Sequence, residues 1–387
     1  MSTRLLLGLA LNASLDGIDA ALVRVDGLGL AAVPVVERYA RTPLLPAVRD
    51  ALRRGTGASP RAIGEALSAA VRQLVAKNGV DLRSVLLTGL HLPAGGAFDT
   101  AAEFVVEITG VTVWSQFAAR DVSAGGTGRP FTAAADYLFA KSLTEDRLLI
   151  HLGQVASLLF LPAGAKVTDL IAFDAGPGGR VLDEFVRLGT RDRELSDVGG
   201  TKAVQGKCLD AVLAEWLAHP HLGRKPPKAI AGEFGPAFVT TAFDAAREQS
   251  ASLADLLCTA THFIARSVGG GCRQFVPPTG RPRGLYVSGG GVRNGFLWQL
   301  LQQQFPGENL RRTDDIGIPA LGRNAVAAAV LAGLTLDGVA ANLPLLTGAS
   351  GGRLVGRFLP GDPRNWAAVT AWAAEQMWDY GQINRAA

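Results

Sequence analysis

The sequence predicts an α/β fold of two similar lobes with a cleft between them. Apolar, β-prone segments alternate with segments of helical spacing along nearly the whole chain, which is the pattern of layered α/β folds. A strand–turn–strand pattern opens each half, first Leu5–Leu11 with Ile18–Val25 and later Arg147–Phe160. The glycine-rich stretch 123–130 separates the halves and is a natural domain boundary.

The first half shows three kinds of element. Its opening hairpin turns at a polar segment that contains Asp16-Gly17, a common hairpin-turn dipeptide. In Pro60–Lys77 the apolar residues from Ile63 to Val75 recur every four positions, which predicts an amphipathic helix. The other elements expected here are a helix and two short buried strands: Pro46–Arg53, Ser84–Leu87 and Val111–Trp114.

The second half repeats the order. Its hairpin is expected to turn near Gly153-Gln154. A buried strand beginning at Gly284 runs into the triple glycine Gly289–Gly291. The segments with helical spacing are Val181–Leu188, Gly206–Ala218, Leu253–Ser267, Phe296–Gln304 and Leu321–Leu334.

Composition excludes several classes of protein. Hydrophobic residues make up 48% and charged residues 19% of the 387 residues, so the chain can bury a large core. The net charge of +4 is scattered, without the basic stripe and interleaved aromatic residues of a nucleic-acid site.

Three widely spaced cysteines fit a reduced, cytoplasmic location. The pair His219-Pro-His221 fits a surface loop better than a metal site. The apolar segments are too short for a membrane helix, and the N-terminal one is read as a strand.

Three glycine-containing loops could approach a phosphate. They are Asn12–Gly17, Gly176-Pro177-Gly178 and Gly289–Gly291. None matches a P-loop or a dinucleotide-binding fingerprint. Bare backbone after a strand suits a nucleotide, but each loop can equally be a tight turn.

A lone carboxylate, Asp174, precedes the second of these loops. A carboxylate beside backbone donors can act as a general base. Asp followed by Gly and Pro is also an ordinary way to begin a helix, so a capping role is the alternative.

Short segments spread over nearly the whole chain form an ordered set. They are Ser14–Asp19; Phe117, Arg120-Asp121 and Gly125–Pro130; Asp174–Gly178 with Asp183; Gly200, Ala203 and Gly206-Lys207; His219-Pro220 and Pro226–Lys228; Val287–Asn294; Thr313-Asp314 and Ile316–Ile318; Asn342–Pro344; and Thr347–Ser350. This set resembles the motifs of the anhydro-N-acetylmuramic acid kinases.

The resemblance implies a particular fold and division of the chain. The fold would be the two-lobed actin-like ATPase (RNase H-like) fold of the actin/hexokinase/Hsp70-like superfamily, with a central interlobe cleft. Lobe I would span residues 1–130 and be completed by 351–387. Lobe II would span 131–350.

The resemblance also implies an activity. Asp174 would take a proton from a water that attacks C1 of the 1,6-anhydro sugar, and O6 would then attack the γ-phosphate of Mg-ATP. The product would be N-acetylmuramic acid 6-phosphate, an intermediate of peptidoglycan recycling. The partners would be an amino sugar and ATP, with no nucleic acid or membrane, and a homodimer is left open.

Site residues follow from the same resemblance. The sugar contacts would be His91, Arg120 and Asp121. Asp16 would contact Mg²⁺ in addition to ATP. The ATP-binding residues would be Asn12, Ala13, Ser14, Asp16, Gly17, Asp19, Gly153, Gly176, Gly178, Gly289, Gly290, Gly291 and Asn294.

Polar positions depart from the family pattern more than the scaffold glycines do. The changed residues include Asn12, Ala13, Gln116, Ala118, Gln154, Ala175, Gly179, Ala231–Phe234 and Asn324. Removing one transition-state donor typically costs about 10²–10³ in rate. The alternative function is therefore a non-catalytic or re-purposed relative that binds nucleotide, sugar or a protein partner.

Several candidate residues also have plain structural alternatives. Asp16 could close its hairpin turn, and Asp121 could form a surface pair with Arg120. His91 could be a core histidine, and Asn294 a turn or cap residue.

Overall fold

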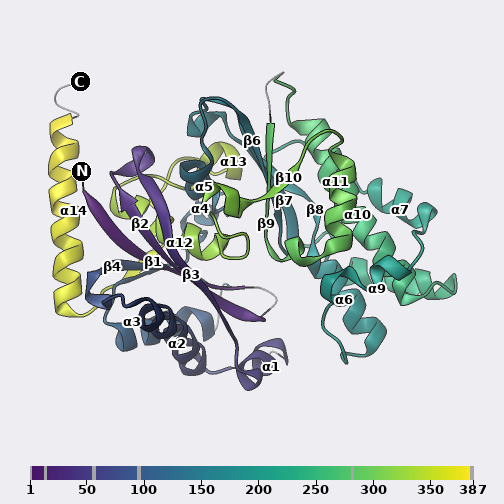
Figure 1. Ribbon diagram of the computed structural model, residues 1–387, viewed down its shortest axis with the longest axis horizontal. Helices are drawn as coiled ribbons and strands as arrows, with labels where there is room; N and C mark the ends of the chain where they lie inside the picture. The colour runs from purple at the N-terminus through teal and green to yellow at the C-terminus, as the bar shows by residue number, and fades with distance from the viewer. Residues whose placement is uncertain (1, 13–14, 55–57, 94–96, 280–282, 384–387) are drawn as a thin grey trace. The chain divides into compact units, whose positions relative to one another are not determined.

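The computed structural model describes residues 2–12, 15–54, 58–93, 97–279 and 283–383. The chain divides into two compact units: unit 1 is Met1–Phe139 with Ile316–Ala387, and unit 2 is Ala140–Asp315. Each unit contains its own β-sheet with associated helices (Figure 1). The predicted α/β fold of two lobes is confirmed.

Unit 1 contains a six-stranded sheet in the order β11-β5-β4-β1-β2-β3. Its strands are β1 (Thr3–Leu11), β2 (Gly17–Asp26), β3 (Val33–Pro43), β4 (Val85–His91), β5 (Val113–Ser115) and β11 (Arg357–Leu359). Its helices are α1 (Pro46–Arg54), α2 (Pro60–Asn78), α3 (Ala97–Thr109), α4 (Ala119–Ser123), α5 (Ala133–Ala140), α12 (Arg323–Leu336), α13 (Pro344–Thr347) and α14 (Pro363–Ile383).

The opening hairpin of unit 1 is confirmed. Strands β1 and β2 pair antiparallel, with Leu11 opposite Ile18. Strand β1 alternates between two buried clusters, as the period of a strand requires. Leu7 and Leu9 pack with α2 and α3, whereas Leu6 packs with α12.

Helix α12 approaches β1 and β4 at glycines. A Cβ on Gly8 would lie 2.7 Å from the carbonyl carbon of Ala325, and one on Gly89 would lie 2.7 Å from the amide nitrogen of Ala329. No real side chain fits at such distances, so the close packing of this helix on the sheet requires glycine at both positions.

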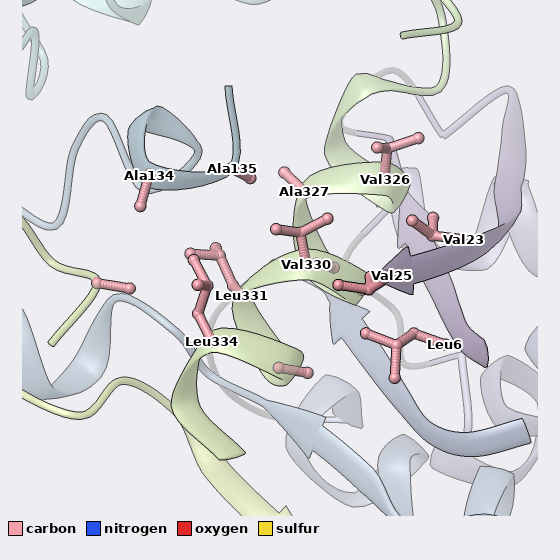
Figure 2. Close-up of a cluster of buried hydrophobic side chains, with 14 of the residues drawn as sticks. Leu6, Val23, Val25, Ala134, Ala135, Val326, Ala327, Val330, Leu331 and Leu334 are labelled. Carbon is pink, nitrogen blue, oxygen red and sulfur yellow. The ribbon is translucent and has the colours of Figure 1, made fainter. Parts of the chain in front are cut away.

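The unit boundaries differ from the predicted lobe boundaries near residues 130 and 350. Helix α12 belongs to unit 1, because Val326 and Val330 lie in the same buried cluster as Leu6 (Figure 2). Helix α5 adds Ala134 and Ala135 to this cluster. A uniformly apolar helix does not reveal from its sequence which sheet it covers, so its unit was misassigned.

Unit 2 contains a five-stranded sheet in the order β10-β9-β6-β7-β8. Its strands are β6 (Asp146–Leu152), β7 (Val155–Leu161), β8 (Ile171–Pro177), β9 (Arg283–Ser288) and β10 (Leu310–Arg312). Its helices are α6 (Gly179–Thr190), α7 (Asp210–Leu217), α8 (Pro220–Gly223), α9 (Pro236–Glu248), α10 (Leu253–Phe275) and α11 (Gly295–Gln304). The predicted second hairpin is confirmed as β6–β7, and its turn is at Gly153-Gln154.

Strand directions bring several loops together in each unit. In unit 1, β4 is parallel to both β1 and β5. In unit 2, β9 is parallel to both β6 and β10, and β8 shares the direction of β6 because both are antiparallel to β7. The carboxyl ends of these strands therefore lie along one edge of each sheet, here called the carboxyl edge. In open α/β sheets this is the edge where ligands bind.

Candidate functional site

Asp174 lies in strand β8, at the carboxyl edge of unit 2. Helix α6 begins at Gly179, its N-cap is Gly178, and no side chain caps it. The capping role considered for Asp174 is therefore wrong. The sequence suggested it because Asp, Gly and Pro begin many helices, but here the strand continues to Pro177.

The backbone of β8 is irregular next to this carboxylate. Asp174 is opposite Ser157 and Gly176 is opposite Ala156, so Ala175 is an extra residue on the β8 side. Such a β-bulge bends a strand and redirects its side chains, and bulges are frequent beside active sites. Asp174 is only 6% exposed.

The chain segment around Lys228 holds Asp174 along the edge of the sheet. The Asp174 N–H donates to the carbonyl of Lys228 at 3.1 Å. The N–H of Ile230 donates to Asp174 Oδ2 at 2.8 Å. An N–H bond to a carboxylate favours its ionised form, which is the form that a general base needs.

Lys228 places a buried cation near this carboxylate. Its Nζ donates to the carbonyls of His221 at 3.3 Å and Leu222 at 2.8 Å. Burial lowers the pKa of Lys228 to about 8, although the charge of Asp174 acts to raise it. From the sequence, Lys228 was named only as the last residue of the motif Pro226–Lys228. Its burial was not predicted, because a lysine usually lies on the surface.

The glycines after Asp174 serve packing. A Cβ on Gly176 would lie 2.6 Å from the Cβ of Ser267 in helix α10. A Cβ on Gly178 would lie 2.8 Å from the carbonyl carbon of Gln154 in the hairpin turn. Both glycines were predicted to bind the cofactor, but the space beside each Cα is filled by protein. Gly153 accepts a hydrogen bond from Gly179 N–H at 2.8 Å, which ties the two loops together.

In the triple glycine after β9, Gly289 and Gly291 pack closely against Leu152, whereas Gly290 is exposed. A Cβ on Gly289 would lie 2.6 Å from the carbonyl carbon of Leu152, and Gly289 has a φ of +92°. A Cβ on Gly291 would lie 2.5 Å from the Cβ of Leu152. Gly290 is exposed, and a Cβ there would meet no atom within 4 Å. Bare, accessible backbone of this kind fits the predicted contact with a nucleotide.

Asn294 is the N-cap of helix α11. Its Oδ1 accepts the N–H of Leu297 at 2.9 Å, and the residue is 9% exposed. This favours the capping alternative over the predicted cofactor contact. A Cβ on Gly200 would lie 3.0 Å from the Cγ of Asn294, so the motif glycine packs against this cap.

In unit 1, the turn after β1 is closed by its own side chains. The Nδ2 of Asn12 donates to Asp16 Oδ1, and the Asp16 N–H donates to Asn12 Oδ1 at 3.2 Å. Asp16 is exposed, and its carboxylate lies 3.8 Å from the guanidinium of Arg41. These contacts support the turn-closing alternative for Asp16. Gly17 begins β2, and the predicted contacts of Ala13 and Ser14 lie outside the described residues.

Asp19 has a structural role in place of its predicted contact with the cofactor. It is 2% exposed and accepts two hydrogen bonds from Arg41, at 2.8 and 2.7 Å, and one from the Tyr39 hydroxyl at 2.7 Å. Tyr39 and Arg41 both lie in β3, the strand paired with β2. A buried carboxylate satisfied in this way joins two strands.

His91 ends β4 at the carboxyl edge of unit 1. Its ring stacks on Phe131, with centroids 4.2 Å apart. Burial lowers the pKa of His91 to about 4, so the ring is neutral at neutral pH. A neutral, half-buried imidazole at this edge is compatible with either the sugar contact or the core alternative. The neighbouring Gln116 donates to Asp99 Oδ1 at 2.9 Å.

Asp121 organises the loops of unit 1. It is 2% exposed. Its Oδ1 accepts from Asn342 Nδ2 at 2.8 Å and from the Thr347 hydroxyl at 2.7 Å, and its Oδ2 accepts from Gly128 N–H at 2.7 Å. The surface pair with Arg120 considered for Asp121 is wrong, because Asp121 is buried. With both oxygens bound to protein, a sugar contact through this carboxylate is not supported, whereas Arg120 is exposed.

The side chains offer little for a metal ion. Among the described residues, no group of three or more His, Cys, Asp and Glu side chains is arranged to hold one. In the same part of the chain, no helix is long and apolar enough to cross a membrane.

His221, which was expected in a surface loop, is fully buried, and its Nδ1 lies 3.2 Å from Glu233 Oε1. The burial of His221 and Lys228 was missed because His and Lys are seldom fully buried.

Solved structures match this fold only at low scores. An activator of 2-hydroxyisocaproyl-CoA dehydratase from Clostridium difficile has a TM-score of 0.43 at 11% identity, covering 84% of this chain and 93% of its own. A ROK family glucokinase from Streptomyces griseus has a TM-score of 0.38 at 14% identity, covering 84% and 98%. Scores this low carry no conclusion about fold or function.

Sequence relatives match much more closely. The anhydro-N-acetylmuramic acid kinase of Salinibacter ruber is 34% identical over 377 residues, covering 90% of this chain and 94% of its own. The relative of the same name from Caldanaerobacter subterraneus is 31% identical over 382 residues, covering 92% and 96%. The family model for anhydro-N-acetylmuramic acid kinase matches residues 4–361. This chain therefore belongs to the anhydro-N-acetylmuramic acid kinase family.

Proposed function

We propose that this chain opens the ring of 1,6-anhydro-N-acetylmuramic acid and phosphorylates it with ATP, giving N-acetylmuramic acid 6-phosphate. The observation that carries the proposal is the placement of Asp174 in this family member. Its carboxylate lies at the carboxyl edge of unit 2, is 6% exposed, and has one oxygen held by a backbone N–H. Asp174 lies beside a bulge in β8, and its side chain does not cap helix α6.

In this mechanism Asp174 is the general base. It takes a proton from water as the water oxygen bonds to C1 of the sugar. The C1–O6 bond breaks, O6 attacks the γ-phosphorus, and ADP leaves with the electrons of the broken P–O bond. The Ile230 N–H is bound to one oxygen of Asp174, and a hydrogen bond of this kind favours the ionised carboxylate that a general base needs.

The residues present suit ATP better than they suit a metal ion. Gly290 offers exposed backbone with no neighbouring atom in the way, which supports an ATP contact there. Kinases use ATP as its Mg²⁺ complex. Asp16, the carboxylate expected to face Mg²⁺, is bound to Asn12 and lies near Arg41, so no step is assigned to a metal ligand of this chain.

The proposal places the chain in peptidoglycan recycling and amino-sugar metabolism. Its small-molecule partners are then ATP and the anhydro sugar. A cytoplasmic location and a homodimer stay predictions. Fractionation of cells and light scattering of the purified protein would test them.

The experiment is a coupled assay for ADP with the anhydro sugar, with product identified by mass spectrometry. Wild type should convert the sugar, and Asp174→Asn should lower kcat by about 10²–10⁴-fold, the usual contribution of a general base. Calorimetry should find ATP binding unchanged in that variant. Wild-type turnover by Asp174→Asn would remove this carboxylate from the mechanism.

A second candidate function is a non-catalytic relative that binds nucleotide or sugar. The closed turn of Asn12 and Asp16 favours it, because side chains occupy a position where the family motif has Gly-Thr beside phosphate. ATP binding by calorimetry without any ADP release in the presence of the sugar would support this candidate and contradict the kinase proposal.

A further inference from the structure

The segment 228–233 lies against β8 and makes two backbone-mediated contacts with Asp174. The Lys228 carbonyl receives the Asp174 N–H, and the Ile230 N–H binds Asp174 Oδ2. The first contact is a backbone hydrogen bond on the open side of β8, the last strand of the sheet, while the second is made to the carboxylate itself. The position of the Ile230 N–H therefore decides how one carboxylate oxygen is held.

Glu233 ties this segment into a compact loop. Its Oε2 accepts the N–H of Ala231 at 2.8 Å and the N–H of Gly232 at 3.0 Å. Burial would raise the pKa of Glu233, but backbone hydrogen bonds within the loop outweigh it and lower the pKa to about 2. The side chain therefore stays ionised and keeps both N–H groups bound throughout the neutral range.

The other oxygen of Glu233 anchors the loop to the rest of unit 2. Oε1 lies 3.2 Å from Nδ1 of His221 and 3.4 Å from the guanidinium of Arg224. His221 is fully buried, so this anchor has a fixed position. The carbonyl of His221 also accepts a hydrogen bond from Lys228, which connects the anchor to the start of the segment.

We infer that Glu233 is a positioning residue for Asp174, acting through the Ile230 N–H. The inference rests on the proposed function, in which Asp174 is the base. The carboxylate of Glu233 contacts N–H groups of its own loop, His221 and Arg224. It shapes the loop that presents one N–H to Asp174, and this hydrogen bond orients the carboxylate plane and favours the ionised form.

The charges around Asp174 set what a titration would report. The charge of Asp174 acts to raise the pKa of Lys228, and the charge of Arg224 acts to lower it. Glu233 interacts with His221 and Arg224 at the far side of the loop. Replacing Glu233 therefore alters Asp174 by releasing the loop, and Lys228 remains in place as a second support.

The test compares Glu233→Ala, Glu233→Gln and a control, Glu215→Ala. Glu215 is an exposed glutamate of helix α7 in the same unit. Two readouts are measured: the titration of the Asp174 carboxyl carbon by ¹³C NMR, assigned with Asp174→Asn, and the pH profile of kcat and KM. Thermal unfolding checks that each variant is folded.

The expected result is a rise of about one unit in the titration midpoint of Asp174 in Glu233→Ala, as expected for losing one N–H bond to the carboxylate. The acidic limb of kcat should move by the same amount, with KM for ATP nearly unchanged. Glu233→Gln keeps one acceptor oxygen and should lie between Glu233→Ala and wild type. Glu215→Ala should match wild type in every measurement.

The NMR readout separates this inference from the proposed function. If wild type shows no turnover, the kinase proposal fails, but the midpoint of Asp174 still reports whether Glu233 positions it. An unchanged midpoint in folded Glu233→Ala and Glu233→Gln would overturn the inference. If Glu233→Ala does not fold, the Glu233→Gln comparison decides in the same way.

Discussion

Replacing Gly176 by alanine tests whether the glycines after Asp174 serve packing or ligand binding. The new Cβ would lie 2.6 Å from the Cβ of Ser267, and closer still to its hydroxyl oxygen. Ser267 is 4% exposed and belongs to helix α10, so the clash occurs inside the core of unit 2. Packing therefore predicts a loss of stability.

The magnitude follows from which atoms can move. Rotating the Ser267 hydroxyl away would break its 2.9 Å hydrogen bond to the Ile264 carbonyl, at a cost of about 1 kcal/mol. The Cβ–Cβ contact would remain, and only a shift of β8 or α10 could relieve it. Overpacking of this kind costs about 1–3 kcal/mol. Together these terms place the loss for Gly176→Ala at roughly 2–4 kcal/mol.

The assay is urea unfolding of four variants beside wild type: Gly176→Ala, Gly290→Ala, Ser267→Gly, and Gly176→Ala combined with Ser267→Gly. Gly290→Ala is the matched control, because a Cβ there meets no atom within 4 Å. It should change the free energy of unfolding by less than about 0.5 kcal/mol, while weakening ATP binding measured by calorimetry. The double variant Gly176→Ala with Ser267→Gly should be more stable than the sum of the single changes, by about 1 kcal/mol or more.

The reasoning would be refuted by the reverse pattern. If Gly176→Ala unfolds at the same urea concentration as wild type but loses ATP affinity, Gly176 is a ligand contact. If Gly290→Ala binds ATP as wild type does, the exposed backbone of the triple glycine is not the contact that we propose.

Two further predictions concern unit 1. Arg323 binds Asp136 through two hydrogen bonds, and the two side chains are 7% and 2% exposed, so Arg323→Met should cost about 3–5 kcal/mol by leaving a buried, unpaired carboxylate. In urea unfolding, adding Asp136→Leu should recover much of that loss; no recovery would show that the cost is not the unpaired charge. Burial lowers the pKa of His91 from 6.5 to about 4, so the unfolded chain takes up a proton below pH 6.5 before the folded one does. The contribution of His91 to stability is therefore fully present above pH 6.5 and is lost as the pH falls toward 4, and His91→Gln should flatten the stability profile in that window; an unchanged slope would contradict the assignment.

Part of the candidate site could be predicted from local patterns. The two hairpins and the strand before the triple glycine follow from apolar runs separated by polar or glycine turns, and their bounds shifted by only a few residues. Strand β3 was missed because most of its residues are exposed or half-buried at the edge of the sheet, so it has no continuous apolar run. Strand β8 was missed because its Asp-Ala-Gly-Pro end has the composition of a helix start.

The roles of the polar residues could not be predicted in the same way. Asp19, Asp121 and Asn294 matched motif positions, and the structure gives each of them protein partners. Those partners are up to 226 positions away, as for Asp121 and Thr347. A motif identifies a residue type at a spacing, but it does not show whether that residue binds a ligand or another part of the chain.

The sequence by itself determined the α/β class, the two hairpin-opened halves and the family, because these depend on the order of local patterns. Only the tertiary structure decided that helix α12 belongs to unit 1, that Asp174 lies beside a bulge in strand β8, and that the loop tied by Glu233 holds it. The physical reason is that hydrogen-bond partners and packing distances depend on which distant segments meet. Local composition does not show which distant segments will be in contact.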